Sequence, residues 1–190
     1  MLASMLTYFT EKKMRKIVYY VAISIDGFIA GENDDISGFT PSGNGVEQYL
    51  NNLKGFDTVI MGKRTYEFGY LFGMKPGQKP YPHMKHYIFS QTLVFEKVYD
   101  GIEICPLNIE KVKSLKEEAG TPIYMCGGGK LAEWLLENEL IDEVKLKLNP
   151  HIIGSGIRLF GESKKAVKLS LKDSKLYDNG LQIMSYEVNY

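Results

Sequence analysis

Two stretches of the 190-residue sequence place glycine beside basic or hydroxyl side chains directly after a short apolar run. They are Met61-Gly62-Lys63-Arg64-Thr65 and Cys126-Gly127-Gly128-Gly129-Lys130. In both, the apolar run predicts a strand and the following residues predict the start of a helix. Unpaired N–H groups at a helix start attract anions, and glycine lets a phosphate approach the backbone closely. The two stretches could therefore bind the two ends of one dinucleotide, or the glycines could simply allow tight strand-to-helix turns.

Neither stretch fits a better-known phosphate-binding motif. A P-loop is excluded, because the residues around neither glycine segment read G-x-x-x-x-G-K-[ST]. Gly127, Gly129 and Ala132 do match the G-x-G-x-x-A pattern of Rossmann folds. That fold requires an acidic residue about 20 positions further on to bind a ribose. Residues 145–151 contain none, so a Rossmann fold is disfavoured.

Composition narrows the classes of partner. The 23 basic and 23 acidic residues give a net charge of zero, which removes the usual electrostatic case for nucleic acid or an anionic membrane. The most apolar stretch, residues 17–25, is too short to span a bilayer. Cys105 and Cys126 lack C-x-x-C spacing and are predicted to be reduced, buried thiols of a cytoplasmic protein. His83 and His86 have no carboxylate nearby in the sequence, so no metal site is predicted.

The elements that must position the glycine segments alternate between strand and helix. Apolar runs predict strands at residues 15–25, 58–61, 86–90, 102–105, 122–126 and 144–148. Helical spacing predicts helices at residues 46–53, from near 63, at 109–118 and at 130–138. Lysines alternate along residues 144–148, so one face of that strand is predicted to meet water.

Two further signals complete the predicted fold. Residues 31–45 read as a long, polar, glycine-rich loop, and loops of this length are usually functional or mobile. Asp178-Asn179-Gly180 separates two alternating runs within residues 167–189 and predicts a closing hairpin. The fold predicted is a mixed, mostly parallel α/β sheet flanked by helices, with a C-terminal antiparallel hairpin. It would form one domain over residues 15–190, after an N-terminal extension at residues 1–14.

Four segments, taken in order, resemble a known family of reductases. Residues 59–67 resemble the V-[IV]-M-G-[RK]-x-T-[WY]-E segment of dihydrofolate reductases, and residues 126–131 resemble their second glycine-rich segment. Residues 24–30 (SIDGFIA) are closer to the S-x-D-G-x-I-A element of the related reductase domain of riboflavin biosynthesis. Residues 140–160 resemble the L-[IV]-D-E…P…G-x-G…[LF]-F pattern of the same domain. The resemblance covers residues 15–189 and implies the dihydrofolate-reductase-like fold.

The resemblance also implies an activity and a cofactor. It implies hydride transfer from NADPH to a small heterocycle of the pterin, folate or aminopyrimidine kind. By similarity, Ser90 and Gln91 would lie near the adenosine ribose and its 2′-phosphate. The other cofactor-binding residues would be Gly62, Lys63, Arg64, Thr65, Gly127, Gly128, Gly129, Lys130 and Leu131. The basic pair at 63 and 64 suits the extra phosphate of NADPH, and analogy with the family implies a homodimer.

The carboxylate that would orient or protonate the substrate ring has two candidates. Glu47 lies on the helix before the M-G-K strand, about where dihydrofolate reductases carry a buried carboxylate; alternatively it is a solvated glutamate in a first helical turn. Asp26 follows a strand and is expected to point into the cleft; alternatively it belongs to a simple Asp-Gly turn. The L-P-W element of dihydrofolate reductases is absent from residues 31–45, which argues against folate itself. A non-catalytic nucleotide-binding module of the same fold is the alternative function.

Overall fold

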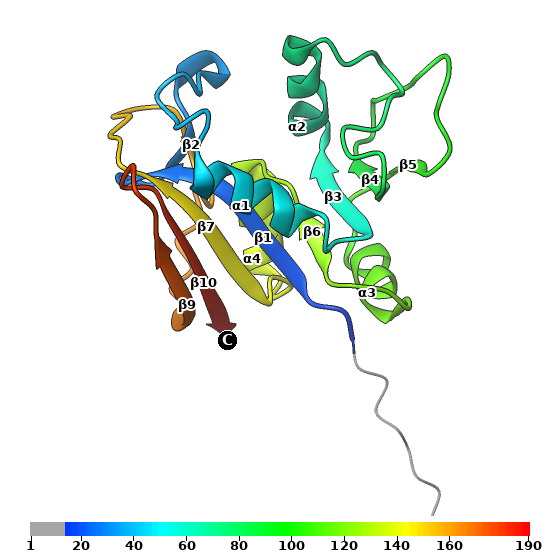
Figure 1. Cartoon of the computed structure of the whole chain (residues 1–190). Helices are drawn as coiled ribbons and strands as arrows, with labels where there is room; N and C mark the ends of the chain where they lie inside the picture. The colour runs from blue at the N-terminus through cyan, green and yellow to red at the C-terminus, as the bar shows by residue number, and fades with distance from the viewer. Residues whose placement is uncertain (1–13) are drawn as a thin grey trace, which may run out of the picture.

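The computed structural model describes residues 14–190, and its centre is an eight-stranded sheet (Figure 1). The strand order is β5-β4-β3-β6-β1-β7-β10-β9. The strands are β1 (Ile17–Ser24), β3 (Thr58–Gly62), β4 (Lys85–Phe89), β5 (Ile102–Cys105), β6 (Ile123–Met125), β7 (Glu143–Asn149), β9 (Lys168–Leu176) and β10 (Gln182–Asn189). The pairs among β1 and β3–β7 are parallel, whereas β10 is antiparallel to both β7 and β9. This confirms the predicted mixed sheet with a C-terminal hairpin. The predicted extension, apart from Met14, lies outside the described residues.

The helices cover both faces of the sheet. They are α1 (Asn44–Leu53), α2 (Lys63–Phe68), α3 (Ile109–Glu117) and α4 (Gly129–Glu137), with the short 3-10 helices η1 (Glu32–Asp34) and η2 (Gly69–Phe72). Residues of α1 and α2 pack in one buried cluster, and residues of α3 and α4 pack in the other. Among the described residues, no helix has the length and apolar character that crossing a bilayer requires.

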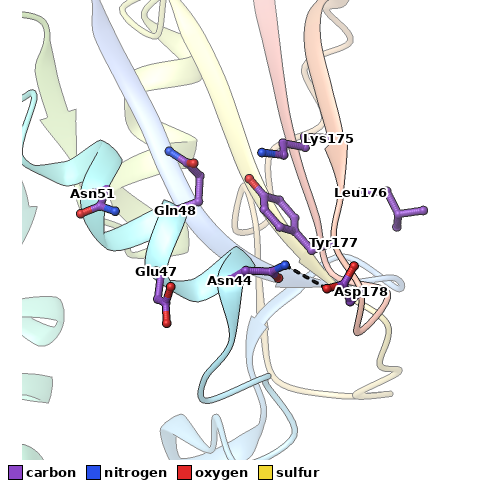
Figure 2. Close-up of a pocket in the computed structure, with 8 residues that line it drawn as sticks. All are labelled: Asn44, Glu47, Gln48, Asn51, Lys175, Leu176, Tyr177 and Asp178. Carbon is purple, nitrogen blue, oxygen red and sulfur yellow. Dashed lines mark hydrogen bonds between the residues drawn. The ribbon is translucent and has the colours of Figure 1, made fainter.

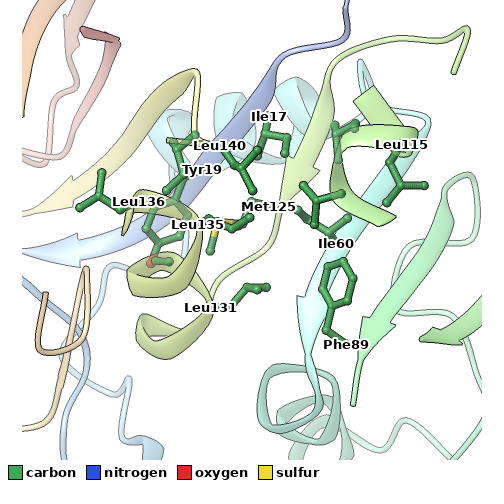
Figure 3. Packing of buried hydrophobic residues seen from close by; sticks show 14 of the residues in the cluster. Ile17, Tyr19, Ile60, Phe89, Leu115, Met125, Leu131, Leu135, Leu136 and Leu140 are labelled. Atoms are coloured by element: carbon green, nitrogen blue, oxygen red, sulfur yellow. The ribbon is translucent and has the colours of Figure 1, made fainter. Parts of the chain in front are cut away.

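Strand β1 explains why the sheet is buried on both sides. Ile17, Tyr19 and Val21 point to the cluster that contains α3 and α4 (Figure 3). Val18 and Tyr20 point to the opposite cluster, which contains α1 and α2. Because side chains alternate along a strand, this apolar run fills both cores at once. The prediction that residues 15–25 form a doubly buried strand is confirmed within its observed bounds.

One face of β7 that was predicted to be exposed to water is covered by α1. The lysine face of β7 was expected to meet water, but Lys147 is buried and its Nζ lies 5.5 Å above the ring centre of Tyr49 of α1. Lys145 Nζ lies 4.9 Å above the ring centre of Tyr20. Aromatic faces attract cations. The two lysine side chains can therefore be covered by neighbouring elements while each ammonium group keeps a favourable contact with an aromatic ring. The expectation of a water-facing side was therefore wrong for most of this strand.

A small second sheet was not predicted. Strand β2 (Phe28–Ala30) pairs antiparallel with β8 (Ile157–Arg158). Strands of three and two residues carry too little alternation to be recognised from sequence. Leu159 N donates to the carbonyl of Gly27, in the turn before β2. The same segment lies beside the start of α4, since a Cβ placed on Gly129 would meet the Arg158 carbonyl and Gly161 N.

The register of two neighbouring strands positions the glycine segments. Strands β3 and β6 are parallel neighbours, with Thr58 opposite Ile123 and Ile60 opposite Met125. Parallel strands end at the same edge of a sheet, and this edge is the usual ligand-binding edge of α/β folds. Both glycine segments therefore begin side by side.

Candidate functional site

A cleft of about 1100 Å³ opens at the carboxyl ends of β3 and β6. It is also lined by residues of α1, of the 31–45 loop, of segment 79–81 and of segment 156–162. Nine of the predicted cofactor-binding residues line it: Gly62, Lys63, Arg64, Thr65, Gly127, Gly128, Gly129, Lys130 and Leu131. The structure thus brings both glycine segments to one cleft.

The two glycine segments touch each other. A Cβ placed on Gly128 would lie 2.8 Å from Thr65 Oγ1, and Gly128 has a φ of 95°. Gly127 has a φ of 143°, so both residues adopt backbone conformations that favour glycine. Gly62 differs, because a Cβ placed there would meet no heavy atom within 4 Å. The backbone at Gly62 is therefore open to a ligand, whereas Gly128 is needed for the contact between the segments.

Basic side chains outnumber acidic ones in the cleft lining, and two of the cations, Lys63 and Arg64, already have carboxylate partners. Lys63 Nζ lies 3.8 Å from Glu67 Oε1. Arg64 donates from Nε to Asp34 Oδ2 at 3.3 Å, and its Nη2 lies 2.9 Å from Asp34 Oδ1. An anion that binds Arg64 must compete with this carboxylate. The remaining basic side chains that line the cleft are Lys79, Lys130 and Arg158.

Ser90 and Gln91 lie outside the cleft lining. Ser90 Oγ accepts hydrogen bonds from the N–H groups of Thr92, at 3.1 Å, and Leu93, at 2.9 Å. Lys63 Nζ donates to Thr92 Oγ1 at 3.4 Å, which places this turn beside the start of α2. The Ser90 hydroxyl stabilises the turn, and the exposed Gln91 lies next to the cleft rather than in it.

The sequence interpretation missed a group of phenols in the same cleft. Tyr49, Tyr81 and Tyr124 line it together with Cys126, and we call these four residues the phenol cluster. Tyr49 Oη lies 3.1 Å from Tyr124 Oη, and Tyr81 Oη lies 3.3 Å from Cys126 Sγ. Tyr49 belongs to the apolar stripe of α1, so helical spacing identifies it as inward-facing. Cys126 is half-buried at the cleft, whereas Cys105 is buried, and both thiols are free.

Comparison with known proteins identifies the family. The sequence model of the RibD C-terminal domain matches residues 15–183. The chain belongs to the RibD C-terminal domain family. YwjB of Bacillus subtilis (strain 168), an uncharacterized protein, is 32% identical over 174 residues, which cover 89% of this chain and 96% of YwjB.

Solved structures of low sequence identity share the fold of this RibD C-terminal domain. A protein from Shewanella sp. PV-4 assigned to riboflavin biosynthesis superposes with a TM-score of 0.78 at 21% identity, covering 93% of this chain and 100% of that one. Dihydrofolate reductase from Enterococcus faecalis, complexed with NADP(H), gives a TM-score of 0.64 at 14% identity, covering 92% and 97%. The chain therefore has the dihydrofolate-reductase-like fold.

Glu47 does not line the cleft of this RibD C-terminal domain. It is exposed and lines a separate groove of about 390 Å³ between α1 and the β9–β10 hairpin (Figure 2). Asn44 and Asp178, which are joined by a hydrogen bond of 3.1 Å, lie in the same groove. Residues two apart on a helix point about 200° apart, so Glu47 and Tyr49 cannot both face the cleft. The α1 side chain in the cleft is a phenol, not a carboxylate.

Asp26, which was expected to point into the cleft, is also absent from the cleft lining. Its carboxylate accepts hydrogen bonds from Ser24 Oγ at 2.6 Å, Ile153 N at 3.1 Å and Gly154 N at 2.7 Å. These bonds, with that from Ser24 the largest cause, lower the pKa of Asp26 to about 2. The carboxylate ties the end of β1 to segment 153–154 of the RibD C-terminal fold.

The segment that carries Tyr81 depends on a buried, neutral histidine. His86 Nε2 accepts from Tyr81 N at 3.3 Å, and Nδ1 lies 3.1 Å from the Met84 carbonyl, to which it can donate. Its ring stacks on that of Tyr81, with centres 6.1 Å apart. Burial lowers the pKa of His86 from 6.5 to about 4.

We predict that acid destabilises the protein through His86. Between pH 6.5 and about 4, the unfolded chain binds a proton at this residue that the folded chain excludes. The free energy of unfolding should therefore fall by about 1 kcal/mol per pH unit as the pH drops through this range. Urea denaturation at pH 7, 6 and 5 measures the slope, and His86→Gln should be less stable at pH 7 but show a flatter slope. Equal slopes would contradict the assignment.

The described residues contain no group of three or more His, Cys, Asp or Glu side chains arranged to hold a metal ion. The groups that line the cleft are glycine backbone, basic side chains, phenols, one thiol and the carboxylates of Asp34, Glu133 and Glu162.

Proposed function

We propose that this protein is an NADPH-dependent reductase that transfers hydride to a small heterocycle. The observation that carries the proposal is the meeting of two glycine segments, from adjacent parallel strands, in one cleft lined by basic side chains. Membership of the RibD C-terminal domain family supports a reductase, as does a fold shared with a dihydrofolate reductase complexed with NADP(H).

The residues present fit a dinucleotide phosphate. Gly62 leaves an open space that a Cβ would fill, and Lys63 and Lys130 supply positive charge beside it. Backbone N–H groups at the start of the nine-residue helix α4 add donors. Arg64 would join them on exchanging its partner Asp34 for a phosphate. When bound, NADPH would supply the hydride.

The protein would contribute binding, orientation and exclusion of water rather than covalent chemistry. Val21, Ile29 and Phe39 line the cleft and make part of it apolar. The proposal gives no catalytic role to Asp26 or Glu47, because neither carboxylate lines the cleft. The proton that accompanies hydride transfer would come from water.

Gly62→Ala tests the cofactor site. The added Cβ meets no protein atom, so the free energy of unfolding should change by less than about 0.5 kcal/mol. The same Cβ occupies the space where a phosphate would approach the backbone, so NADPH affinity should fall about tenfold, or ~1.4 kcal/mol. Titration calorimetry with NADPH measures the affinity, and urea denaturation measures the stability.

Two readouts on the wild-type protein separate the alternatives. NADPH at 100 times its Kd should stabilise the fold by about 2.7 kcal/mol, and the absence of any rise in Tm would contradict cofactor binding. A rise in Tm without NADPH oxidation across pterins, dihydrofolate and aminopyrimidines would instead favour a non-catalytic nucleotide-binding module. Loss of absorbance at 340 nm with one of these substrates would establish the reductase.

A further inference from the structure

One ion pair joins two sides of the cleft. Asp34 belongs to the 31–45 loop and Arg64 belongs to α2, and both residues line the cleft. Figure 1 shows this loop and α2 on opposite sides of the upper edge of the sheet. Among the described residues, no other hydrogen bond or salt bridge connects residues 31–45 with α2. We call the Asp34–Arg64 contact the cross-cleft ion pair.

The loop has its anchors on the other side of the cleft from α2. Near its start, Glu32 Oε1 accepts a hydrogen bond from Ser155 Oγ at 3.1 Å. Near its end, Thr40 N donates to Asn149 Oδ1 of β7 at 3.0 Å. Strand β7 lies three positions along the sheet from β3, which leads into α2. Breaking the cross-cleft ion pair would therefore leave the loop anchored at both ends but separate from α2.

The backbone that presents Asp34 adopts an unusual conformation. Asn33 and Asp34 have φ values of 56° and 63°, so two consecutive residues other than glycine are left-handed. This conformation is unfavourable for residues that carry a Cβ, although asparagine and aspartate tolerate it better than most. The cross-cleft ion pair offsets part of this cost. Its loss therefore favours a change of backbone conformation at residues 33–34.

The ion pair also occupies the donors that an anion would use. Nε and Nη2 form one edge of the Arg64 guanidinium group, and they lie 3.3 and 2.9 Å from the two carboxylate oxygens of Asp34. A phosphate binds most strongly to two such donors at once, so it competes with Asp34 for the same edge. The Arg64 side chain is 68% exposed, and exposed ion pairs are weak. An anion of higher charge can therefore displace Asp34.

We propose that the cross-cleft ion pair is an autoinhibitory contact, in which Asp34 occupies Arg64 until a diphosphate displaces it and thereby releases residues 32–37 from α2. The proposal rests on the proposed function in that the natural anion would be the diphosphate of the dinucleotide. Asp34 then has two effects. It lowers the affinity of the cleft for the anion, and it couples anion binding to movement of the loop that contributes Ile36 and Phe39 to the cleft lining.

Inorganic pyrophosphate tests the competition, by titration calorimetry at constant ionic strength. Asp34→Asn keeps the size of the side chain but removes its charge, so pyrophosphate should bind this variant about fivefold more tightly than wild type. Asp35→Asn is the matched control, because it makes the same change in net charge one residue away. Asp35 accepts a hydrogen bond from Ser37 N at 2.9 Å and does not line the cleft. The control should change the affinity by less than about twofold.

A third variant shows whether the gain acts through Arg64. Arg64→Gln removes the cation, so pyrophosphate should bind it more weakly than wild type. Adding Asp34→Asn to this variant should then raise the affinity no more than Asp35→Asn does. A full fivefold gain in the absence of Arg64 would contradict the proposed competition.

Backbone hydrogen exchange reports the release of the loop. Asp35 N donates to the Glu32 carbonyl at 3.2 Å, and Ser37 N donates to the Asp35 side chain, so both amides are in bonds internal to the released segment. Such bonds open more often once the segment is less constrained. Saturating pyrophosphate should increase deuterium uptake over residues 32–37 in wild type. In Asp34→Asn, uptake should already be high without the anion.

Several results would overturn the proposal. Weaker pyrophosphate binding by Asp34→Asn would mean that Asp34 positions Arg64 for the anion instead of blocking it. Equal gains in Asp34→Asn and Asp35→Asn would assign the effect to net charge. The proposal also fails if neither wild type nor Asp34→Asn binds pyrophosphate at millimolar concentration, or if the anion leaves uptake over residues 32–37 unchanged or lower.

The outcome is separable from that of the proposed function, because the pyrophosphate measurements need no NADPH. A protein that shows the expected effects of Asp34→Asn with pyrophosphate but fails to bind NADPH would contradict the reductase and support the autoinhibitory contact. A protein that binds NADPH with the same affinity in wild type and Asp34→Asn, with no change in exchange of the loop, would do the reverse.

Discussion

Gly129→Ala is expected to lower the free energy of unfolding by about 3 kcal/mol. Alanine normally stabilises a helix relative to glycine by up to about 1 kcal/mol. Here the added Cβ would lie 2.4 Å from the Arg158 carbonyl oxygen and 3.2 Å from Gly161 N. Both obstacles are backbone atoms, held by the β2–β8 pairing and by the Gly161 N–H bond to Arg158 O, so neither can rotate away. The clash therefore outweighs the gain in helix propensity.

Gly62→Ala is the internal control for this prediction, because it adds the same methyl group at the other glycine segment in open space. Urea denaturation of both variants should show a large decrease in the free energy of unfolding for Gly129→Ala and almost none for Gly62→Ala. Comparable decreases in stability would contradict the prediction, because they would mean that segment 157–161 moves away from the added methyl group at little cost. Since Arg158 and Gly161 line the cleft, Gly129→Ala should also weaken any ligand bound there.

Local patterns in the sequence were sufficient to predict most strands of the sheet. The strand predicted at residues 102–105 has the observed bounds, and the helix predicted at 109–118 ends one residue later than α3. These elements follow from spacing within a few turns or pleats, which is local information. The covered face of β7 did not follow, because it depends on α1 crossing the sheet about 100 residues earlier in the chain, as the Lys147–Tyr49 contact shows.

The residues of the candidate site also fall into those that could be located from the sequence and those that could not. Glycine, basic and hydroxyl residues at strand ends could be located from sequence, since parallel neighbours end at one edge. The two carboxylates could not be placed, because each depends on side-chain direction. Glu47 is separated from the inward-facing Tyr49 by two helical positions, and Asp26 is held by N–H groups of Ile153 and Gly154, more than 120 residues away. Tyr124 was not recognised as a site residue, because it lies in β6, whose apolar sequence is typical of a buried core strand.

Asp142→Asn is expected to cost about 3 kcal/mol of stability, the lower end for breaking a buried ion pair. The carboxylate lies 2.7 and 2.9 Å from Lys116 Nζ, and the Lys116 side chain is only 7% exposed. Asp142 Oδ2 also accepts from Ile17 N at 2.7 Å, so it joins α3 to the start of β1. An asparagine can keep one hydrogen bond but supplies no charge, which leaves the ammonium group buried without a counter-ion.

Lys116→Met separates the charge effect from loss of packing. Methionine keeps most of the apolar stem, and the remaining Asp142, 32% exposed, retains water and the Ile17 N–H as partners. This variant should therefore lose less stability than Asp142→Asn, and the double variant should be more stable than Asp142→Asn alone. Urea denaturation of the wild-type protein and the three variants gives the coupling free energy between Lys116 and Asp142. A double variant whose loss equals the sum of the two single losses would show that the pair contributes nothing, and would assign the Asp142 effect to its hydrogen bond with β1.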